Sequence, residues 1–481
     1  MPTHIFVTAG IRCRSINSIQ QFHFMQSRRE FLKQAGAFAL GAPFLIGRGA
    51  RLFKPSCVIV GAGLAGLAAA YRLGAAGWNV TIIEARDRIG GRVLSYRLPE
   101  NPSLVCELGA EWVGASHERI QGLCREFGIR LQDHRFKITL LSDGAIKRPG
   151  TWHYTPASEA AFEKLKHDFE KYGQKEKEQL DRYDWWTVLE KIGFSQDDLR
   201  LRDLFDSTDF GESIRGVSAY AAASEYFESS PENEMDFKME GGNSRLVEEL
   251  VARIGRSAIR TGMPVEEIRQ RAGRVTLTAK GETFTADACI CTVPSRMLEA
   301  IRFDPPLPSA QSAAAQQLQY ARIIKTSVLY SERFWSDENF SMVSDRTAHY
   351  YFHATQNQRD TNAANGASQQ GIITSYAIGE KADVLAAQSD KKKMDIVSNG
   401  LMAINEHAST LARGVAAYAW QRDRWTEGAY AVYRPGQWFG VRPVLAKPHG
   451  KVLFAGEHLA DWQGFMEGAV VTGEEAAGRL L

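Results

Sequence analysis

Three glycines near residue 60 have the spacing of a nucleotide-binding turn. Gly61, Gly63 and Gly66 form a GxGxxG pattern between an apolar, strand-like run and an apolar run with helical spacing. Gly61 permits the tight turn, Gly63 lets a pyrophosphate approach the backbone, and Gly66 lets the helix pack closely on the strand. Glu84, 18 residues after Gly66, ends a second strand-like run and can accept hydrogen bonds from a ribose. Because free N–H groups at the helix N-terminus also favour phosphate, the segment predicts a dinucleotide site.

The residues that follow Glu84 indicate which dinucleotide is bound. They read ARDRIGGR and supply two more glycines flanked by arginines. Paired arginines and backbone N–H groups suit a second approach to the pyrophosphate. With this continuation the chain resembles the flavin amine oxidase superfamily, which includes bacterial flavin monoamine oxidases, polyamine oxidases and L-amino-acid oxidases. The resemblance implies FAD, with contacts from Ala85, Arg86, Gly91 and Arg92.

Five further stretches resemble motifs of this family and occur in the family's order. They are ELGAEWVG at 107–114, GGNSRL at 241–246, Pro264-Val265, ARIIKT at 321–326 with Phe334-Trp335, and FAGEH at 454–458 with GFMEGA at 464–469. The resemblance implies further FAD contacts from Gly109, Ala110, Glu111, Trp112, Val265, Trp425, Gly456, Glu457, Phe465 and Met466. The likeness therefore extends over residues 56–481.

The distribution of these motifs predicts the fold. We expect an α/β protein with a Rossmann-like FAD-binding domain of the GR2 amine oxidase type and an interleaved α+β substrate-binding domain. Because FAD-contacting motifs occur at the start, middle and end of the chain, the FAD-binding domain should be discontinuous. Its predicted pieces are 51–130, 236–310 and 421–481, and the substrate-binding pieces are 131–235 and 311–420.

Lys325 is the first candidate catalytic residue. It stands in a β-branched run, IIKTSVLY, where a buried lysine is costly and usually has a task. The alternative is a lysine at a strand edge with its ammonium group in solvent. By the resemblance, Lys325 holds a water molecule against flavin N5 and assists reoxidation by O2.

Tyr430 and Phe465 are the other candidate catalytic residues. The resemblance places them face to face before the flavin as an aromatic cage, which orients an amine that passes between two π faces. The alternative is two core aromatics. Phe465 departs from the family, which most often has tyrosine at both walls. Ala429 stands where covalent monoamine oxidases carry a flavin-attaching cysteine, which implies non-covalent FAD.

The C-terminal motif predicts one more contribution to the flavin. The segment 464–466 should open the last helix, with N-terminal N–H groups directed at the flavin pyrimidine ring. A helix end there would stabilise the negative charge that this ring gains on reduction. Glu457 is expected to meet the ribityl hydroxyls.

The resemblance implies an FAD-dependent amine oxidase. A neutral primary or secondary amine would transfer a hydride to flavin N5, the imine would hydrolyse to an aldehyde and ammonia, and O2 would reoxidise FAD with release of H2O2. L-amino-acid oxidase and polyamine oxidase activities are the nearer alternatives. An FAD-dependent desaturase or protoporphyrinogen-type oxidase, and a non-catalytic FAD-fold binding module, are more distant. The intact GxGxxG glycines disfavour the binding module.

Two features bear on the substrate. An acidic stretch precedes Gly241 and would favour diamines or polyamines if it lined the entrance, although a solvated face is the plainer interpretation. Its members are Glu225, Glu228, Glu232, Glu234, Asp236 and Glu240. An L-amino-acid oxidase needs an arginine for the substrate carboxylate, and Arg119 is the candidate nearest to Trp112. With no better candidate, the sequence favours simple amines over amino acids.

Composition sets wider limits on the function. The chain has 481 residues, 44% hydrophobic and 24% charged, which indicates a soluble protein of two or three packed units. Its 58 basic and 56 acidic residues leave a net charge of +2, so no global field attracts nucleic acid. Its six cysteines form no CxxC pair, and no metal is predicted. The predicted partners are a small-molecule amine and O2, with a homodimer left open.

The N-terminus carries a predicted export signal. Arg28 and Arg29 precede Phe31-Leu32-Lys33 and an uncharged stretch of 14 residues, 34–47, which is short for a membrane span. This pattern resembles a twin-arginine (Tat) signal, which serves proteins exported already folded. It implies the Tat export machinery as a partner and a periplasmic location. A membrane anchor formed by an uncleaved signal, or a helix of the mature fold, is the alternative for residues 1–50.

Overall fold

The structure, a computed structural model, describes residues 54–231, 233–335, 337–361 and 369–481. All of them belong to the unit Ala50–Leu481. The predicted twin-arginine segment lies outside these residues. Among the helices that the structure describes, none has the length and apolar character that a membrane span requires.

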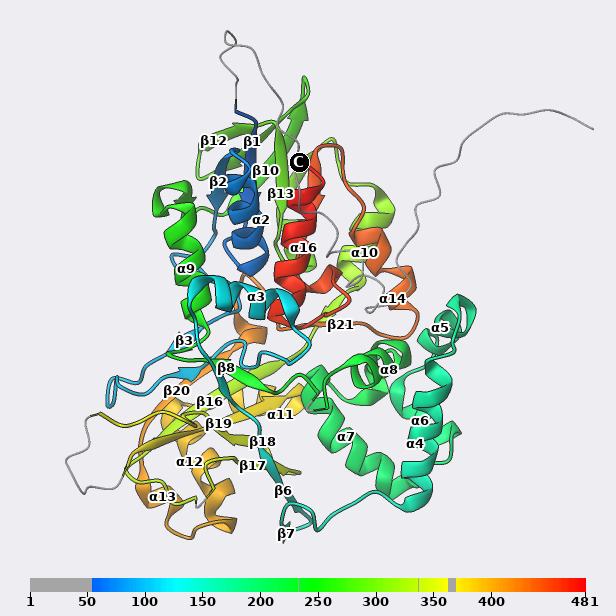
Figure 1. Ribbon diagram of the computed structural model, residues 1–481, viewed down its shortest axis with the longest axis vertical. Coiled ribbons are helices and arrows are strands. Elements are labelled where there is room, and N and C mark those ends of the chain that lie inside the picture. The colour runs from blue at the N-terminus through cyan, green and yellow to red at the C-terminus, as the bar shows by residue number, and fades with distance from the viewer. Residues whose placement is uncertain (1–53, 232, 336, 362–368) are drawn as a thin grey trace, which may run out of the picture. The chain divides into compact units, whose positions relative to one another are not determined.

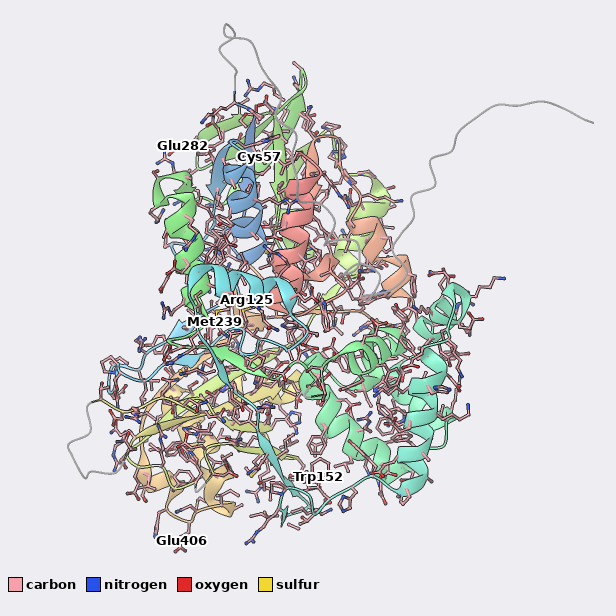
Figure 2. All side chains as sticks on the ribbon, viewed as in Figure 1. Cys57, Arg125, Trp152, Met239, Glu282 and Glu406 are labelled. Atoms are coloured by element: carbon pink, nitrogen blue, oxygen red, sulfur yellow. The ribbon has the colours of Figure 1, made fainter. Side chains whose placement is uncertain are left out.

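A five-stranded parallel sheet carries the glycine-rich turn. Its strands lie in the order β22-β13-β1-β2-β9, and Figure 1 labels β13, β1 and β2. The predicted apolar run forms β1 between two parallel neighbours, and its residues 57–60, with Cys57 labelled in Figure 2, are buried as expected of a central parallel strand. The strands are β1 (Ser56–Val60), β2 (Asn79–Ile83), β9 (Ile259–Arg260), β13 (Ala288–Cys291) and β22 (Val452–Phe454).

Helices α2 (Leu64–Ala75) and α16 (Met466–Gly478) pack side by side in this part of the structure (Figure 1). They approach so closely that a Cβ atom at Gly473 would lie 2.1 Å from the Ala65 carbonyl oxygen. Met466 begins the last helix, as the sequence predicts. The helices that pack against this pair are α3 (Glu118–Phe127) and α9 (Ser244–Ile254).

A four-stranded sheet in the order β12-β11-β10-β14 follows β9 in the chain. Strand β10 pairs antiparallel with β11 and parallel with β14. Val265 is the first residue of β10, directly after the turn that follows β9. The strands are β10 (Val265–Arg271), β11 (Arg274–Ala279), β12 (Glu282–Ala286) and β14 (Arg302–Asp304).

A seven-stranded mixed sheet carries Lys325. Its order is β20-β16-β19-β18-β17-β6-β7, and β16 lies between β20 and β19 (Figure 1). Strands β16 and β19 are buried along their whole length, so Lys325 is not at a strand edge. The strands are β6 (Lys137–Ser142), β7 (Ala145–Lys147), β16 (Ile323–Tyr330), β17 (Phe340–Ser344), β18 (Tyr350–His353), β19 (Gly371–Ile378) and β20 (Ala412–Ala419).

Helices α4 to α8 lie between β7 and β8 in the chain and pack against one another. Helices α4 to α8 are α4 (Pro156–Phe169), α5 (Gln174–Asp181), α6 (Trp185–Lys191), α7 (Gln196–Phe210) and α8 (Ala219–Glu228). The others are α10 (Ser309–Gln317), α11 (Gly379–Ala386), α12 (Asp390–Gly400), α13 (Ala408–Leu411), α14 (Gln437–Gly440) and α15 (Arg442–Leu445). Short strand pairs join β3 (Ser95–Tyr96) to β4 (Cys106–Glu107), β5 (Leu131–Asp133) to β8 (Phe237–Met239), and β15 (Gln319–Tyr320) to β21 (Ala431–Val432).

The chain passes repeatedly between the two large sheets. The strands of the parallel sheet come from 51–130, 236–310 and 421–481. The strands of the mixed sheet come from 131–235 and 311–420. The result is an α/β fold with a parallel sheet and a separate mixed sheet, the class that the sequence predicts.

Candidate active site

One cavity brings together the residues that the sequence assigns to the cofactor and to catalysis. It extends from the β1–α2 turn of the parallel sheet to strand β16 of the mixed sheet. Except for Gly66, every predicted site residue lines it. These wall residues are Gly61, Gly63, Glu84, Ala85, Arg86, Gly91, Arg92, Gly109, Ala110, Glu111, Trp112, Val265, Lys325, Trp425, Tyr430, Gly456, Glu457, Phe465 and Met466.

The glycine-rich turn leaves open space where a phosphate group would approach. A Cβ atom at Gly66 would lie 2.0 Å from the Gly61 carbonyl oxygen, so Gly66 serves the packing of α2 and does not face the cavity. A Cβ atom at Gly63 would have the Gly91 Cα, at 3.9 Å, as its nearest neighbour. Gly63 is also the N-cap of α2 and supplies no side-chain cap. The first N–H groups of this helix are therefore available to a bound anion.

Glu84 lines the cavity in a fixed orientation. Its Oε2 accepts a hydrogen bond from the Ala62 N–H at 2.7 Å, and its Oε1 accepts one from the Arg86 N–H at 2.8 Å. The side chain is 5% exposed. A carboxylate oxygen can accept more than one hydrogen bond, so both oxygens can still receive ribose hydroxyls.

Two arginines line the same part of the cavity, and each is paired with a carboxylate. Arg86 Nη2 lies 2.5 Å from Asp423 Oδ1, and Arg92 Nη1 lies 2.5 Å from Glu457 Oε1. Burial opposes the ionisation of Glu457, but the charge of Arg92 and other contacts hold the pKa of this carboxyl below its usual value. These pairs fix the wall from which a pyrophosphate or ribityl chain would be contacted.

Several buried polar atoms in the cavity wall have no hydrogen-bond partner among the described residues. They are Arg86 Nε, Trp112 Nε1, Asn233 Oδ1 and Gln463 Oε1. Buried polar atoms in native proteins are almost always hydrogen-bonded, so a polar ligand fits these positions. Together with the open helix end and the carboxylate of Glu84, they fit a dinucleotide that runs along the cavity.

Lys325 reaches the cavity as one member of a buried ionic cluster. Its Nζ lies 2.6 Å from Glu111 Oε2, and the two side chains are 4% and 1% exposed. The other Glu111 oxygen, Oε1, lies 3.3 Å from Lys238 Nζ and 3.1 Å from His134 Nε2. Burial opposes the ionisation of Glu111, but the charges of Lys238 and Lys325 hold its pKa well below the usual range. The solvent-exposed alternative for Lys325 is therefore wrong.

Sequence reasoning missed Lys238 and His134. Lys238 stands between the apolar residues Phe237 and Met239 in strand β8, and Figure 2 labels Met239 beside it in the chain. A lysine flanked by apolar residues in a strand is the same signal that singled out Lys325. For His134 the sequence offers no comparable signal.

The two predicted cage aromatics line one cavity. The Tyr430 ring lies against the backbone of Gly464, where a Cβ atom would be 2.9 Å from Tyr430 Cδ2. The Tyr430 hydroxyl donates to the Asp209 carbonyl oxygen and lies 3.4 Å from the Tyr376 hydroxyl. Phe465 packs edge-on against His117, with ring centroids 5.0 Å apart. Both rings thus have fixed positions beside the cavity, and their face-to-face arrangement stays a prediction.

The acidic stretch is a solvated face only in part: Glu228 is half-buried, Glu240 is 39% exposed, and Glu232 lies outside the described residues. Glu225, Glu234 and Asp236 are all at most 5% exposed, and Glu225 lines the cavity. Backbone N–H groups and serine hydroxyls bind the carboxyl groups of Glu234 and Asp236, and periodicity in the sequence could not show these contacts. Asp209, which sequence reasoning missed, also lines the cavity, and burial raises its pKa to about 7.

Arg119 lies outside the cavity wall. Its Nη2 pairs with Glu474 Oε1 on α16 at 2.5 Å, and the side chain is 41% exposed. Among the described residues, the arginines of the cavity wall are Arg86 and Arg92, both near the glycine-rich turn. The structure therefore gives Arg119 no contact with a ligand in this cavity.

The chain is similar in sequence to flavin enzymes along most of its length. Residues 64–481 match the family model described as flavin containing amine oxidoreductase. An L-amino-acid oxidase of Protobothrops flavoviridis is 26% identical over 457 residues, which cover 87% of each chain. The flavin-containing amine oxidase A of Sus scrofa is 25% identical over 458 residues, which cover 88% of this chain and 84% of the relative.

Solved structures share the fold. Cyclohexylamine oxidase from Brevibacterium oxydans IH-35A matches with a TM-score of 0.77 at 20% identity, over 89% of this chain and 98% of that one. Putrescine oxidase bound to putrescine matches with a TM-score of 0.77 at 21% identity, over 89% and 99%. The cavity with its glycine-rich turn and buried lysine, together with the family match over most of the chain, shows that this protein belongs to the flavin-containing amine oxidoreductase family.

Proposed function

We propose that the protein is an FAD-dependent oxidase of small amines, with O2 as electron acceptor. The observation that carries the proposal is the single cavity in which the glycine-rich turn, Lys325, Tyr430 and Phe465 meet. FAD bound there would supply the site that accepts a hydride. A peroxide-coupled assay with monoamines, diamines and L-amino acids tests the proposal, and turnover of none of these classes would contradict it.

The chain's own residues bind, orient and enclose the reacting groups. The α2 N-terminus and Gly63 receive the pyrophosphate, and Glu84 receives the ribose. Tyr430 and Phe465 orient an amine, and the buried wall excludes water. Lys325 keeps its ammonium at the cavity, where it can hold a water molecule as a hydrogen-bond donor.

The charged groups of the cavity wall favour amines over L-amino acids as substrates. Near Tyr430 the wall includes the carboxyl groups of Asp209 and Glu225, and each wall arginine is already paired, Arg86 with Asp423 and Arg92 with Glu457. A carboxylate on the substrate would find both wall arginines already paired and would lie beside acidic groups, whereas a second amino group would find an acidic partner there. The substrate screen should therefore rank amines, with diamines included, above L-amino acids.

We propose that FAD is held without a covalent bond. Ala429 lines the cavity next to Tyr430, and its methyl side chain cannot form a thioether. Acid or heat denaturation should therefore release all of the flavin absorbance into the protein-free filtrate. Flavin that stays with the precipitated polypeptide would overturn this point.

Activity should increase with pH. An alkylammonium group loses its proton near pH 10, so the fraction of neutral amine rises about tenfold per pH unit below that value. If the neutral amine is the reacting species, kcat/KM should increase between about pH 6 and pH 9 in parallel with that fraction. Initial rates at several pH values and substrate concentrations give kcat/KM as a function of pH. A flat profile would contradict the requirement for a neutral amine.

We also propose that the Tat machinery exports the protein to the periplasm. The support is the Arg28–Arg29 pair followed by the uncharged stretch 34–47. Replacing both arginines by lysine should retain the enzyme in the cytoplasm of the host, and cell fractionation by flavin absorbance checks it. Equal periplasmic amounts in both forms would contradict export by this route. A homodimer stays a prediction that light scattering can check.

A further inference from the structure

We propose that Glu111 is a positioning residue that holds the Lys325 ammonium at the cavity wall and keeps it charged. The inference rests on the proposed function only in so far as Lys325 lies beside the reacting groups. The resemblance implies an FAD contact from Glu111, whereas the structure joins its carboxylate to Lys325. A carboxylate that acts through a second residue in this way tunes the site without touching the substrate.

Three contacts fix the Glu111 carboxylate. Oε2 accepts from Lys325 Nζ at 2.6 Å, and Oε1 lies within 3.3 Å of both Lys238 Nζ and His134 Nε2. The Glu111 side chain is 1% exposed and cannot turn toward bulk solvent. Since both oxygens are engaged, rotation of the carboxylate would break contacts on both sides. Lys325 is therefore held at a defined point.

The ammonium of Lys325 depends on Glu111 more than the ammonium of Lys238 does. Lys238 also donates to the Ala354 carbonyl oxygen at 3.0 Å. Among the described residues, Glu111 is the one hydrogen-bond acceptor of Lys325. Its other close neighbours are the rings of Trp112 and Phe352, whose centroids lie 5.7 Å and 5.6 Å from Nζ. A ring face attracts a cation, but it stabilises the charge less than a carboxylate does.

The charges around the cluster make Glu111 its counter-ion. Burial lowers the pKa of His134, which is therefore neutral near pH 7. Burial raises the pKa of Glu107, and burial raises the pKa of the Cys106 thiol to about 11. Glu107 accepts hydrogen bonds from the Asn243 N–H and the Ser95 hydroxyl, so among the described residues Glu111 is the one carboxylate paired with both ammonium groups. Without that carboxylate, two like charges would share one buried site, and one of them would lose its proton.

The consequence is a permanent positive charge at the cavity wall. Two of the three N–H bonds of the Lys325 ammonium have no protein acceptor among the described residues, so they remain available to a bound group. A fixed cation in the cavity wall stabilises negative charge that develops beside it. Glu111 thereby fixes where this positive charge lies in the cavity wall.

Chemical labelling of the purified holoenzyme tests the inference directly. Acetic anhydride acetylates only the uncharged form of a lysine, and peptide mass spectrometry can follow Lys325 against the exposed Lys164 as an internal reference. At pH 7 the relative labelling of Lys325 should increase at least about tenfold in Glu111→Gln and stay within about threefold of the parent in Glu111→Asp. The matched control is Lys238→Gln, which should leave Lys325 unlabelled.

A double variant separates charge from loss of structure. Glu111→Gln with Lys238→Gln removes the repelling ammonium, so labelling of Lys325 should return toward the parent level. Local unfolding would leave labelling high in the double variant and would overturn the inference, as would equal labelling of Lys325 in the parent and Glu111→Gln. Should Glu111→Gln fail to fold, labelling of Lys325 well above the parent level in Glu111→Asp or in the double variant would overturn the inference.

A second readout concerns the reaction with O2. The rate of flavin reoxidation should be independent of pH in the parent between about pH 6 and pH 9 and should fall with rising pH in Glu111→Gln. Parallel profiles in the two proteins would overturn the inference. If neither protein retains flavin or oxidises an amine, the proposed function fails, and the labelling result still decides the role of Glu111.

Discussion

Replacing Gly63 by alanine should deprive the protein of flavin while leaving it folded. The new Cβ atom has room in the protein, because its nearest neighbour is the Gly91 Cα at 3.9 Å. The backbone of Gly63, with φ −76° and ψ 177°, also suits an alanine. The methyl group would, however, occupy the space through which a pyrophosphate reaches the N–H groups of α2.

The expected loss of affinity for FAD is at least about 100-fold. Charge-assisted hydrogen bonds contribute about 1.5–3 kcal/mol each, and 1.4 kcal/mol corresponds to a tenfold change. Flavin absorbance per mole of purified protein and titration of the flavin-free protein with FAD measure the effect. The circular dichroism spectra and melting temperatures of the flavin-free parent and of flavin-free Gly63→Ala should agree, since no protein contact changes.

Two neighbouring glycines serve as controls. Gly74 in the same helix has no atom within 4 Å of an added Cβ, so Gly74→Ala should keep its flavin and gain up to about 1 kcal/mol of stability. Gly66→Ala would instead place Cβ 2.0 Å from the Gly61 carbonyl oxygen and should yield little folded protein. Full flavin content in Gly63→Ala would show that the pyrophosphate does not pass Gly63.

Replacing Lys325 by methionine should slow reoxidation of the enzyme by O2 about 100-fold. Loss of one preorganised donor at a reacting centre typically lowers a rate by 10²–10³. Methionine suits the buried strand β16, and Glu111 would keep its contacts with Lys238 and His134. The protein should therefore fold, and the anaerobic bleaching of flavin by amine should change by less than about tenfold.

Stopped-flow absorbance separates the two half-reactions. Enzyme is bleached anaerobically with amine and then mixed with buffer of known O2 content. Lys164→Met, on the exposed face of α4, removes a surface ion pair with Asp168 and should alter neither rate. An unchanged reoxidation rate in Lys325→Met would show that this lysine does not act on the reaction with O2. If only the anaerobic bleaching by amine were slowed in Lys325→Met, the lysine would act in the oxidation of the amine instead.

Much of the fold and most of the site could be predicted from the sequence because local geometry carries that information. The GxGxxG turn requires glycine at Gly61 and Gly66 for steric reasons that hold wherever the turn occurs, and the structure shows the same close contact between them. An apolar run before the turn specifies a central parallel strand, and β1 is buried accordingly. The domain boundaries that the motif order predicts stay a prediction.

The tertiary structure alone decided the electrostatics of the site. Glu111 and Lys325 are 214 residues apart, and Lys238 lies between them in the chain, so no local pattern shows that their charges meet in one buried cluster. The acidic residues around Glu225 look solvated in sequence, because a carboxyl group carries no mark of its own burial. Residue types and spacing thus determine what a segment can bind, whereas the charge that a buried side chain retains depends on which distant partners the fold places beside it.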